Sequence, residues 1–132
     1  MGDEVLVYRF VPVWWCDVID GQWEFQSGAF DNASPEDPDE SPDDMSVVLG
    51  DTLAALARVP SELAHTPLRG DKWGVAVLEV RYLRHEEQQD LRRTPNDIEQ
   101  AHGDVRGKKN GKRRKRLKAH ADWVVRPAAP PV

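Results

Sequence analysis

The stretch WGVAVLEVRYL, residues 73–83, predicts the fold most directly. In an extended chain its side chains alternate, so that Ala76 and Leu78 lie on one face while Val75 and Val77 lie on the other. Few polar residues interrupt this pattern. The stretch therefore predicts a β-strand that runs from Trp73 to Leu83.

The N-terminal third of the chain also has the pattern of a sheet. A strand over residues 4–10 would place Arg9 on the same face as Val5 and Val7. Further along, Asp20-Gly21 indicates a tight hairpin, because a type I′ turn needs positive φ at both central positions. The two strands of this hairpin are expected over residues 13–19 and 22–26.

The remaining elements are shorter. A strand is expected over 45–49, a helix from Asp51, a helix over 112–121 and a last strand over 121–126. Residues 85–93 are charged on every side and predict a solvated helix or loop. Together the elements predict an α+β fold, mostly antiparallel sheet with two or three short helices.

Length and composition indicate one α+β domain over residues 1–126, followed by a Pro-rich tail over 127–132. The single cysteine, Cys16, excludes an intramolecular disulfide and a Cys-rich zinc site. The acidic start, Met1 to Glu4, is unlike a signal peptide, and no apolar run is long enough for a membrane helix. We therefore expect a cytoplasmic protein without a membrane partner.

Charge is distributed very unevenly along the chain. The net charge of −5 combines 18 Lys and Arg with 23 Asp and Glu. Residues 106–118 hold nine of the basic residues and no acid, whereas residues 31–44 hold seven acids, three prolines and no base. Like charges repel and proline lacks an amide donor, so residues 31–44 are expected to form a mobile acidic loop.

The basic segment, residues 106–118, is the strongest functional signal. Such a concentration of cations attracts polyanions whatever their sequence. The partner would be nucleic acid or an acidic protein; alternatively, the acidic loop of the same molecule neutralises the segment. The candidate binding residues are Arg106, Lys108, Lys109, Lys112, Arg113, Arg114, Lys115, Arg116 and Lys118.

Several short motifs resemble a group of small, uncharacterised bacterial proteins, and this resemblance implies no function. The shared pieces span most of the chain, ending in a Lys/Arg-rich helix that leads into a Trp-Val-Val-Arg-Pro motif. They are Arg9 with Pro12, Ser27 to Phe30, Met45 to Val47, Gly74 to Ala76, Ala101-His102 with Val105, and Trp123 to Pro127.

Signals for catalysis are weak. The four histidines are isolated, so neither a metal site nor a cofactor is expected. If Arg9 and Glu79 lay on the same side of the sheet, they would form, with Ser27 and His102, a cleft that resembles those of ADP-ribosyltransferases and would bind NAD. A structural ion pair between Arg9 and Glu79 is the favoured interpretation.

The dipeptide Trp14-Trp15 suggests an interface, because in a strand its indoles point to opposite faces. An exposed indole would suit a subunit of a toxin–antitoxin or phage-defence complex. The favoured function remains a non-enzymatic accessory protein that presents the basic segment to a polyanion, with the NAD-binding enzyme and the complex subunit as alternatives.

Overall fold

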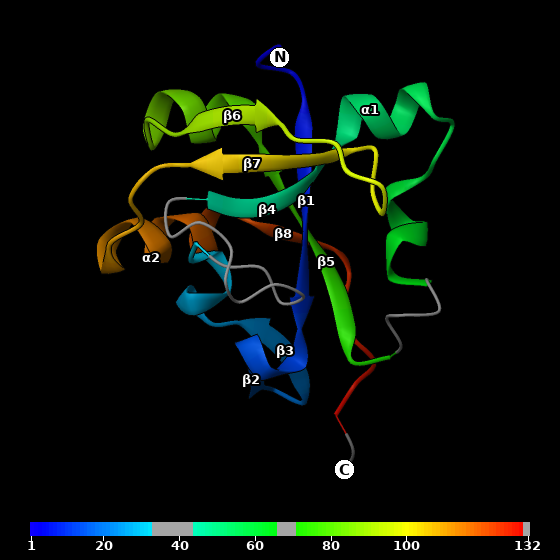
Figure 1. The fold of residues 1–132 in the computed structure, drawn as a ribbon. Coiled ribbons are helices and arrows are strands. Elements are labelled where there is room, and N and C mark those ends of the chain that lie inside the picture. Colours follow the sequence, from blue (N-terminus) through cyan, green and yellow to red (C-terminus); the bar gives the residue numbers. More distant parts are fainter. Residues whose placement is uncertain (33–43, 66–70, 131–132) are drawn as a thin grey trace.

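The computed structural model describes residues 1–32, 44–65 and 71–130 (Figure 1). Its main feature is an antiparallel sheet of six strands in the order β6-β7-β4-β1-β5-β8. The strands are β1 (Leu6–Pro12), β4 (Asp44–Leu49), β5 (Trp73–Glu79), β6 (Asp90–Arg93), β7 (His102–Arg106) and β8 (Asp122–Val125). The prediction of an α+β fold with a mostly antiparallel sheet is confirmed.

The central pair, β1 and β5, sets the limits of its neighbours. Leu6 at the start of β1 lies opposite Glu79, and Pro12 at its end lies opposite Trp73. Strand β5 ends at Glu79, so the prediction that it reaches Leu83 is wrong. The backbone N–H groups of Val80 and Arg81 still donate to Val5 and Asp3, but the chain has already left the extended conformation. The chain turns instead into a short π-helix, η4 (Tyr82–Glu86).

The predicted hairpin is confirmed as β2 (Cys16–Ile19) and β3 (Gln22–Phe25). Asp20 and Gly21 between the strands have φ angles of 51° and 77°, as a type I′ turn requires. The first strand is shorter than predicted because Val13–Trp15 form a turn of 3-10 helix, η1. The register of β1 with β5 ends at Pro12, directly before this turn.

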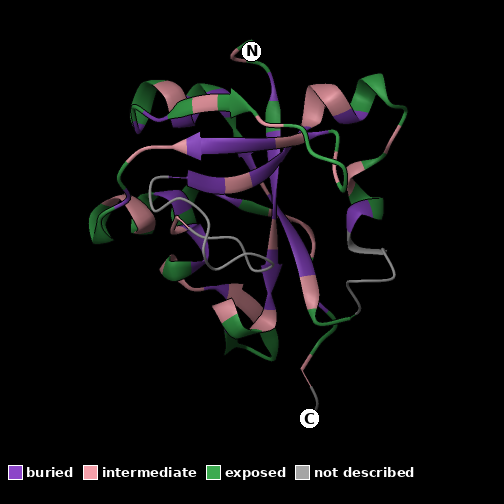
Figure 2. Ribbon diagram, in the orientation of Figure 1, coloured by how far each residue is buried: buried purple, intermediate pink, exposed green. Residues whose placement is uncertain are grey.

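Two layers of core lie on opposite faces of the sheet, and the strands between them are largely buried (Figure 2). On one face, α1 (Gly50–Ala55) and η3 (Pro60–His65) contribute Leu53 and Leu63. On the other face, η2 (Ser27–Phe30) and α2 (Gly111–His120) contribute Phe30 and Leu117, both fully buried. Leu117 is the buried residue that α2 contributes to this core.

The charged stretch 85–93 is not the solvated segment that its composition predicts. Glu87 and Gln89 are buried, and residues 90–93 form the edge strand β6. Glu87 can be buried because basic side chains of α2 compensate its charge.

In the part of the chain that the structure describes, no helix has the length and apolar character needed to span a membrane.

Candidate polyanion interface

Helix α2 carries most of the basic segment, and local signals fix its start. The Asn110 side chain accepts a hydrogen bond from the backbone N–H of Arg113 at 2.9 Å, which caps the helix. Lysine and arginine have good intrinsic helix propensity, but like charges one turn apart repel. The helix therefore depends on contacts outside itself, namely the burial of Leu117 and an ion-pair network.

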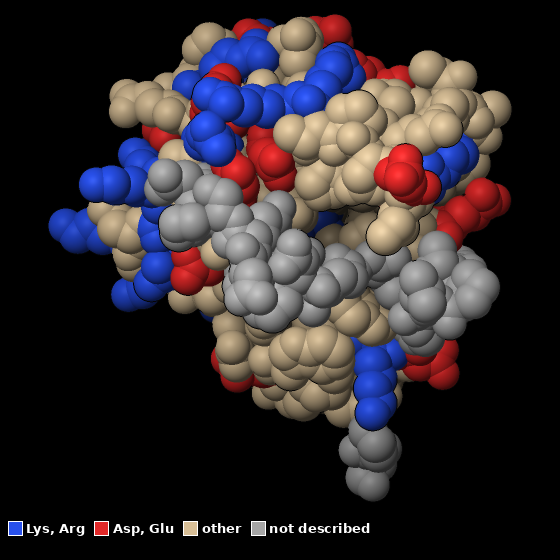
Figure 3. Space-filling view, in the orientation of Figure 1, with Lys and Arg blue, Asp and Glu red and all other residues tan. Residues whose placement is uncertain are grey.

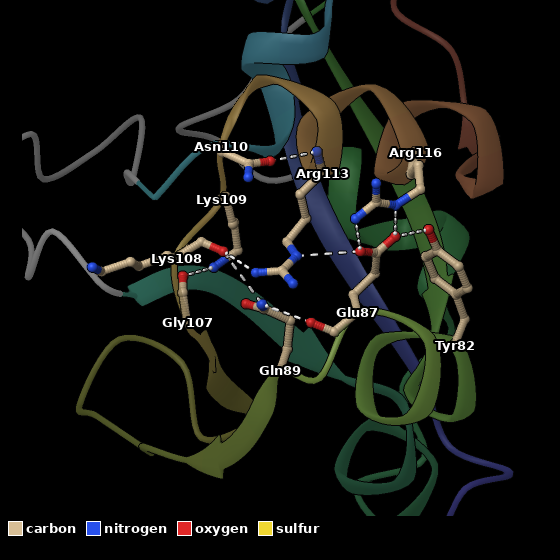
Figure 4. Close-up of polar contacts among 9 residues, drawn as sticks. All are labelled: Tyr82, Glu87, Gln89, Gly107, Lys108, Lys109, Asn110, Arg113 and Arg116. Atoms are coloured by element: carbon tan, nitrogen blue, oxygen red, sulfur yellow. Dashed lines mark hydrogen bonds and ion pairs between the residues drawn. The ribbon is translucent and has the colours of Figure 1, made fainter.

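The centre of that network is the carboxylate of Glu87, which is 1% exposed (Figure 4). Arg116 donates from Nε and Nη2 to its two oxygens, both at 2.8 Å. Arg113 donates from Nε at 3.2 Å, and the Tyr82 hydroxyl also donates to the carboxylate. Two arginines of α2 thus share one buried carboxylate from the turn that follows η4.

These contacts perturb the pKa values of the acid and the phenol. The hydrogen bonds from Arg116 lower the pKa of Glu87 to about 2, although burial opposes this change. Burial and the neighbouring carboxylate raise the pKa of Tyr82. The Tyr82 ring stacks on the His120 ring with centroids 3.7 Å apart, so both ends of α2 contact the same short segment.

Lys109 is the buried lysine of the segment, 5% exposed. Its ammonium donates to the carbonyl oxygens of Val105 at 3.0 Å and Gly107 at 2.9 Å, and to the side-chain oxygen of Asn32. Burial lowers its pKa to about 8, and Arg9 nearby adds to this effect. Lys109 holds the loop before α2 in place and is not available to a macromolecule.

Two further arginines pair with the described ends of the acidic loop. Arg106 donates to Asp44 at 2.7 Å, and Arg114 lies 3.6 Å from Asp31. The pairing with Arg106 lowers the pKa of Asp44. Neutralisation of the basic segment by the same molecule therefore occurs at both ends of the loop; residues 33–43, and the prediction that they are mobile, lie outside the described residues.

The other four cations form what we call the outer lysine face: Lys108, Lys112, Lys115 and Lys118. All four are exposed, and none pairs with a carboxylate among the described residues. Within α2, Lys112 and Lys115 lie on the side opposite Leu117, and Lys118 lies on the flank of the helix, given about 100° per residue. Basic side chains project from this part of the surface in Figure 3, and Lys108 points away from the Glu87 network in Figure 4.

The proposed meeting of Arg9 and Glu79 does not occur. Arg9 lies opposite Ala76 on one face of the sheet, whereas Glu79 lies opposite Leu6 on the other face and is exposed. Strand β5 pairs Glu79 with Leu6, which is an odd number of residues from Arg9, and alternation separates the two side chains. An ion pair between them is excluded, and a shared cleft for NAD is not formed.

Arg9 is instead a structural residue, 2% exposed. It donates to the carbonyl oxygens of Ala29 at 2.7 Å, Ser46 at 2.8 Å and Asp31 at 3.2 Å. The guanidinium also lies over the Trp15 ring, 5.0 Å from its centroid. These contacts bind η2 and the start of the acidic loop to the sheet.

Ser27 and His102 lie apart from each other as well. Ser27 begins η2, whereas His102 lies at the start of β7, where its ring contacts Thr94 and Ser46. Of the interface candidates, Trp14 is 58% exposed with its ring edge against Trp73, while Trp15 is half-buried against the core.

Among the described residues, no group of three His, Cys, Asp or Glu is arranged to hold a metal.

Sequence reasoning missed Glu87 and Gln89. Nothing in a run of charged residues distinguishes the carboxylate that will be buried from those that stay in water. The positive charge of residues 106–118 indicates that a compensating acid exists, but Glu87 precedes Arg113 by 26 residues.

Comparison with protein-family models, with curated proteins and with solved structures finds no match for this chain.

Proposed function

We propose that this protein is a non-enzymatic accessory protein that binds the phosphate backbone of nucleic acid through its outer lysine face. The observation that carries the proposal is the division of the basic segment into two groups. Four arginines and Lys109 are engaged inside the molecule, whereas Lys108, Lys112, Lys115 and Lys118 are exposed without an acidic partner among the described residues.

The kind of cation that remains exposed favours contacts that require no single geometry. Arginine recognises carboxylates and phosphates in a fixed geometry through its planar fork of donors, and the forks of Arg106 and Arg116 already hold Asp44 and Glu87. Lysine acts as a compact point charge that suits phosphate groups in many orientations. The outer lysine face is therefore better adapted to a polyphosphate chain than to a defined acidic protein surface.

Binding of this kind is driven by the release of counterions. With four phosphates neutralised on a duplex, the logarithm of the affinity should fall with the logarithm of salt with a slope of about −3.6. Contacts of lysine to phosphate position a protein without reporting base sequence. We therefore expect weak, salt-sensitive binding to duplexes of any sequence.

The experiment is a salt titration of binding to a 20-base-pair duplex, with two double variants of equal charge change. K112Q/K115Q removes the centre of the outer lysine face, and K72Q/R81Q removes two exposed cations that flank β5 in the sequence. The first variant should weaken binding and reduce the slope by about 1.8, whereas the second should leave the slope unchanged. Equal loss in both variants, or equal competition by polyglutamate and DNA, would reject the proposal.

A further inference from the structure

A pocket of about 580 Å³ lies beside the C-terminal end of α2, between that helix, the β2–β3 hairpin and β8. Its apolar walls include Ile19, Phe25 and Trp123. Two basic and two acidic side chains also line it: Lys118, Arg126, Glu24 and Asp122. The volume is in the range of small-molecule sites.

The aromatic part of the pocket is well ordered by its contacts. The rings of Phe25 and Trp123 are stacked with centroids 4.0 Å apart, and Phe25 is buried. Arg126 is held by Glu24 at 2.6 Å and by Gln22 at 2.7 Å, so that its charge partly compensates that carboxylate. Asp122 is exposed and forms no ion pair with the other described residues.

The pocket is continuous with the outer lysine face, because Lys118 belongs to both. Lys112 and Lys118 are six residues apart, which corresponds to about 9 Å along the helix axis. A polynucleotide whose phosphates lie along these lysines would bring its next nucleotide to the mouth of the pocket.

We infer that the pocket receives an unpaired base of a single-stranded nucleic acid, an inference that rests on the proposed function. Aromatic and apolar walls suit the flat surface of a base, which in a duplex is covered by its stacked neighbours. Lys118 would neutralise the phosphate of that nucleotide, and the Asp122 carboxylate can accept a hydrogen bond from a base N–H. The outer lysine face would thus bind any polynucleotide, and the pocket would add selectivity for single strands.

The test uses two neighbouring residues of β2 with equal exposure. Ile19 is 50% exposed and lines the pocket, while Val18 is 51% exposed and does not line it. The variants I19D and V18D therefore add the same charge at nearly the same place. Each is titrated with a labelled ten-nucleotide single strand, with the 20-base-pair duplex, and with adenosine monophosphate while the Trp123 indole N–H resonance is followed by NMR.

We expect the wild-type protein to prefer the single strand, I19D to lose about tenfold in affinity for it, and V18D to lose less than twofold. Adenosine monophosphate should shift the Trp123 resonance in the wild type and in K112Q/K115Q, but not in I19D. If I19D and V18D lose the same affinity for the single strand and duplex binding is intact, the pocket is not a base-binding site, and the proposed function still stands. A shift by adenosine monophosphate without binding of either polynucleotide would reject the proposed function and leave the pocket as a mononucleotide site. The absence of both the shift and polynucleotide binding would reject the proposed function and the pocket site together.

Discussion

Replacement of Glu87 by glutamine is the sharpest test of how α2 is held. The ordinary pKa of a glutamate is 4.5 and that of Glu87 is about 2. At 1.36 kcal/mol per pH unit this difference corresponds to about 3 kcal/mol of folding free energy at neutral pH. The Glu87→Gln variant leaves Arg113 and Arg116 without their carboxylate and turns an amide N–H₂ toward one of them. We therefore expect a loss of about 3 kcal/mol, or roughly 10 °C in melting temperature.

The same linkage predicts how the effect depends on pH. Because the folded-state pKa is lowered, the stabilisation is complete above pH 4.5 and is lost as the pH falls toward 2, since the unfolded chain takes up the proton first. At pH 3 about 2 kcal/mol of it should be gone. Urea denaturation followed by circular dichroism at pH 7 and pH 3 measures both quantities.

The exposed neighbour Glu86 supplies the matched control. Glu86→Gln removes the same charge from the same turn and should change the unfolding free energy by less than about 0.5 kcal/mol. If the two variants unfold alike at pH 7, Glu87 does not hold the helix. If the Glu87→Gln deficit is the same at both pH values, the lowered pKa is not its cause.

Three further predictions concern the basic segment, the acidic loop and the cysteine. Acetylation at pH 8, followed by mass spectrometry, should modify Lys108 and Lys112 at least about tenfold faster than Lys109, because the Lys109 amine is buried and donates three hydrogen bonds. The lowered pKa of Lys109 acts in the opposite direction by leaving more of its amine unprotonated, and equal rates would contradict its burial. Neutralising the acids of residues 33–43, with Asp31 and Asp44 kept, should raise duplex affinity several-fold at 50 mM salt and have little effect at 500 mM, because tethered carboxylates compete with phosphate; a rise that persists at high salt would point to another cause. Burial raises the pKa of Cys16 to about 12, so iodoacetamide should label it only after unfolding, and rapid labelling of the native protein would show that the β2–β3 hairpin opens.

Short sequence patterns correctly predicted the elements whose conformation is specified within a few residues. The alternation in residues 73–79 and the Asp20-Gly21 turn each specify a conformation within a few residues, and both were correct. Strand β7, with the sequence HGDVR, has no such pattern. It is a strand because β4 and β6 supply partners on both sides, and because Gly103 leaves room for Leu49, whose side chain would lie 2.6 Å from an added Cβ.

The candidate interface was located by sequence, but its composition was not. Charge density identified residues 106–118. Which of their cations form ion pairs inside the molecule depends on three acids that lie far away in the chain, namely Glu87, Asp31 and Asp44. For the same reason the register that separates Arg9 from Glu79 could not be deduced. Alternation along each strand was correct, but only the pairing of β1 with β5 relates the two faces.

The division between arginine and lysine makes folding and binding separable on one helix. Arg113 and Arg116 are bound to a buried acid, so their removal should destabilise the protein whatever it binds. Lys112 and Lys115 repel each other one turn apart, and their neutralisation should leave stability unchanged or slightly higher. The phosphates of the partner proposed above would offset this repulsion, because each would neutralise a lysine.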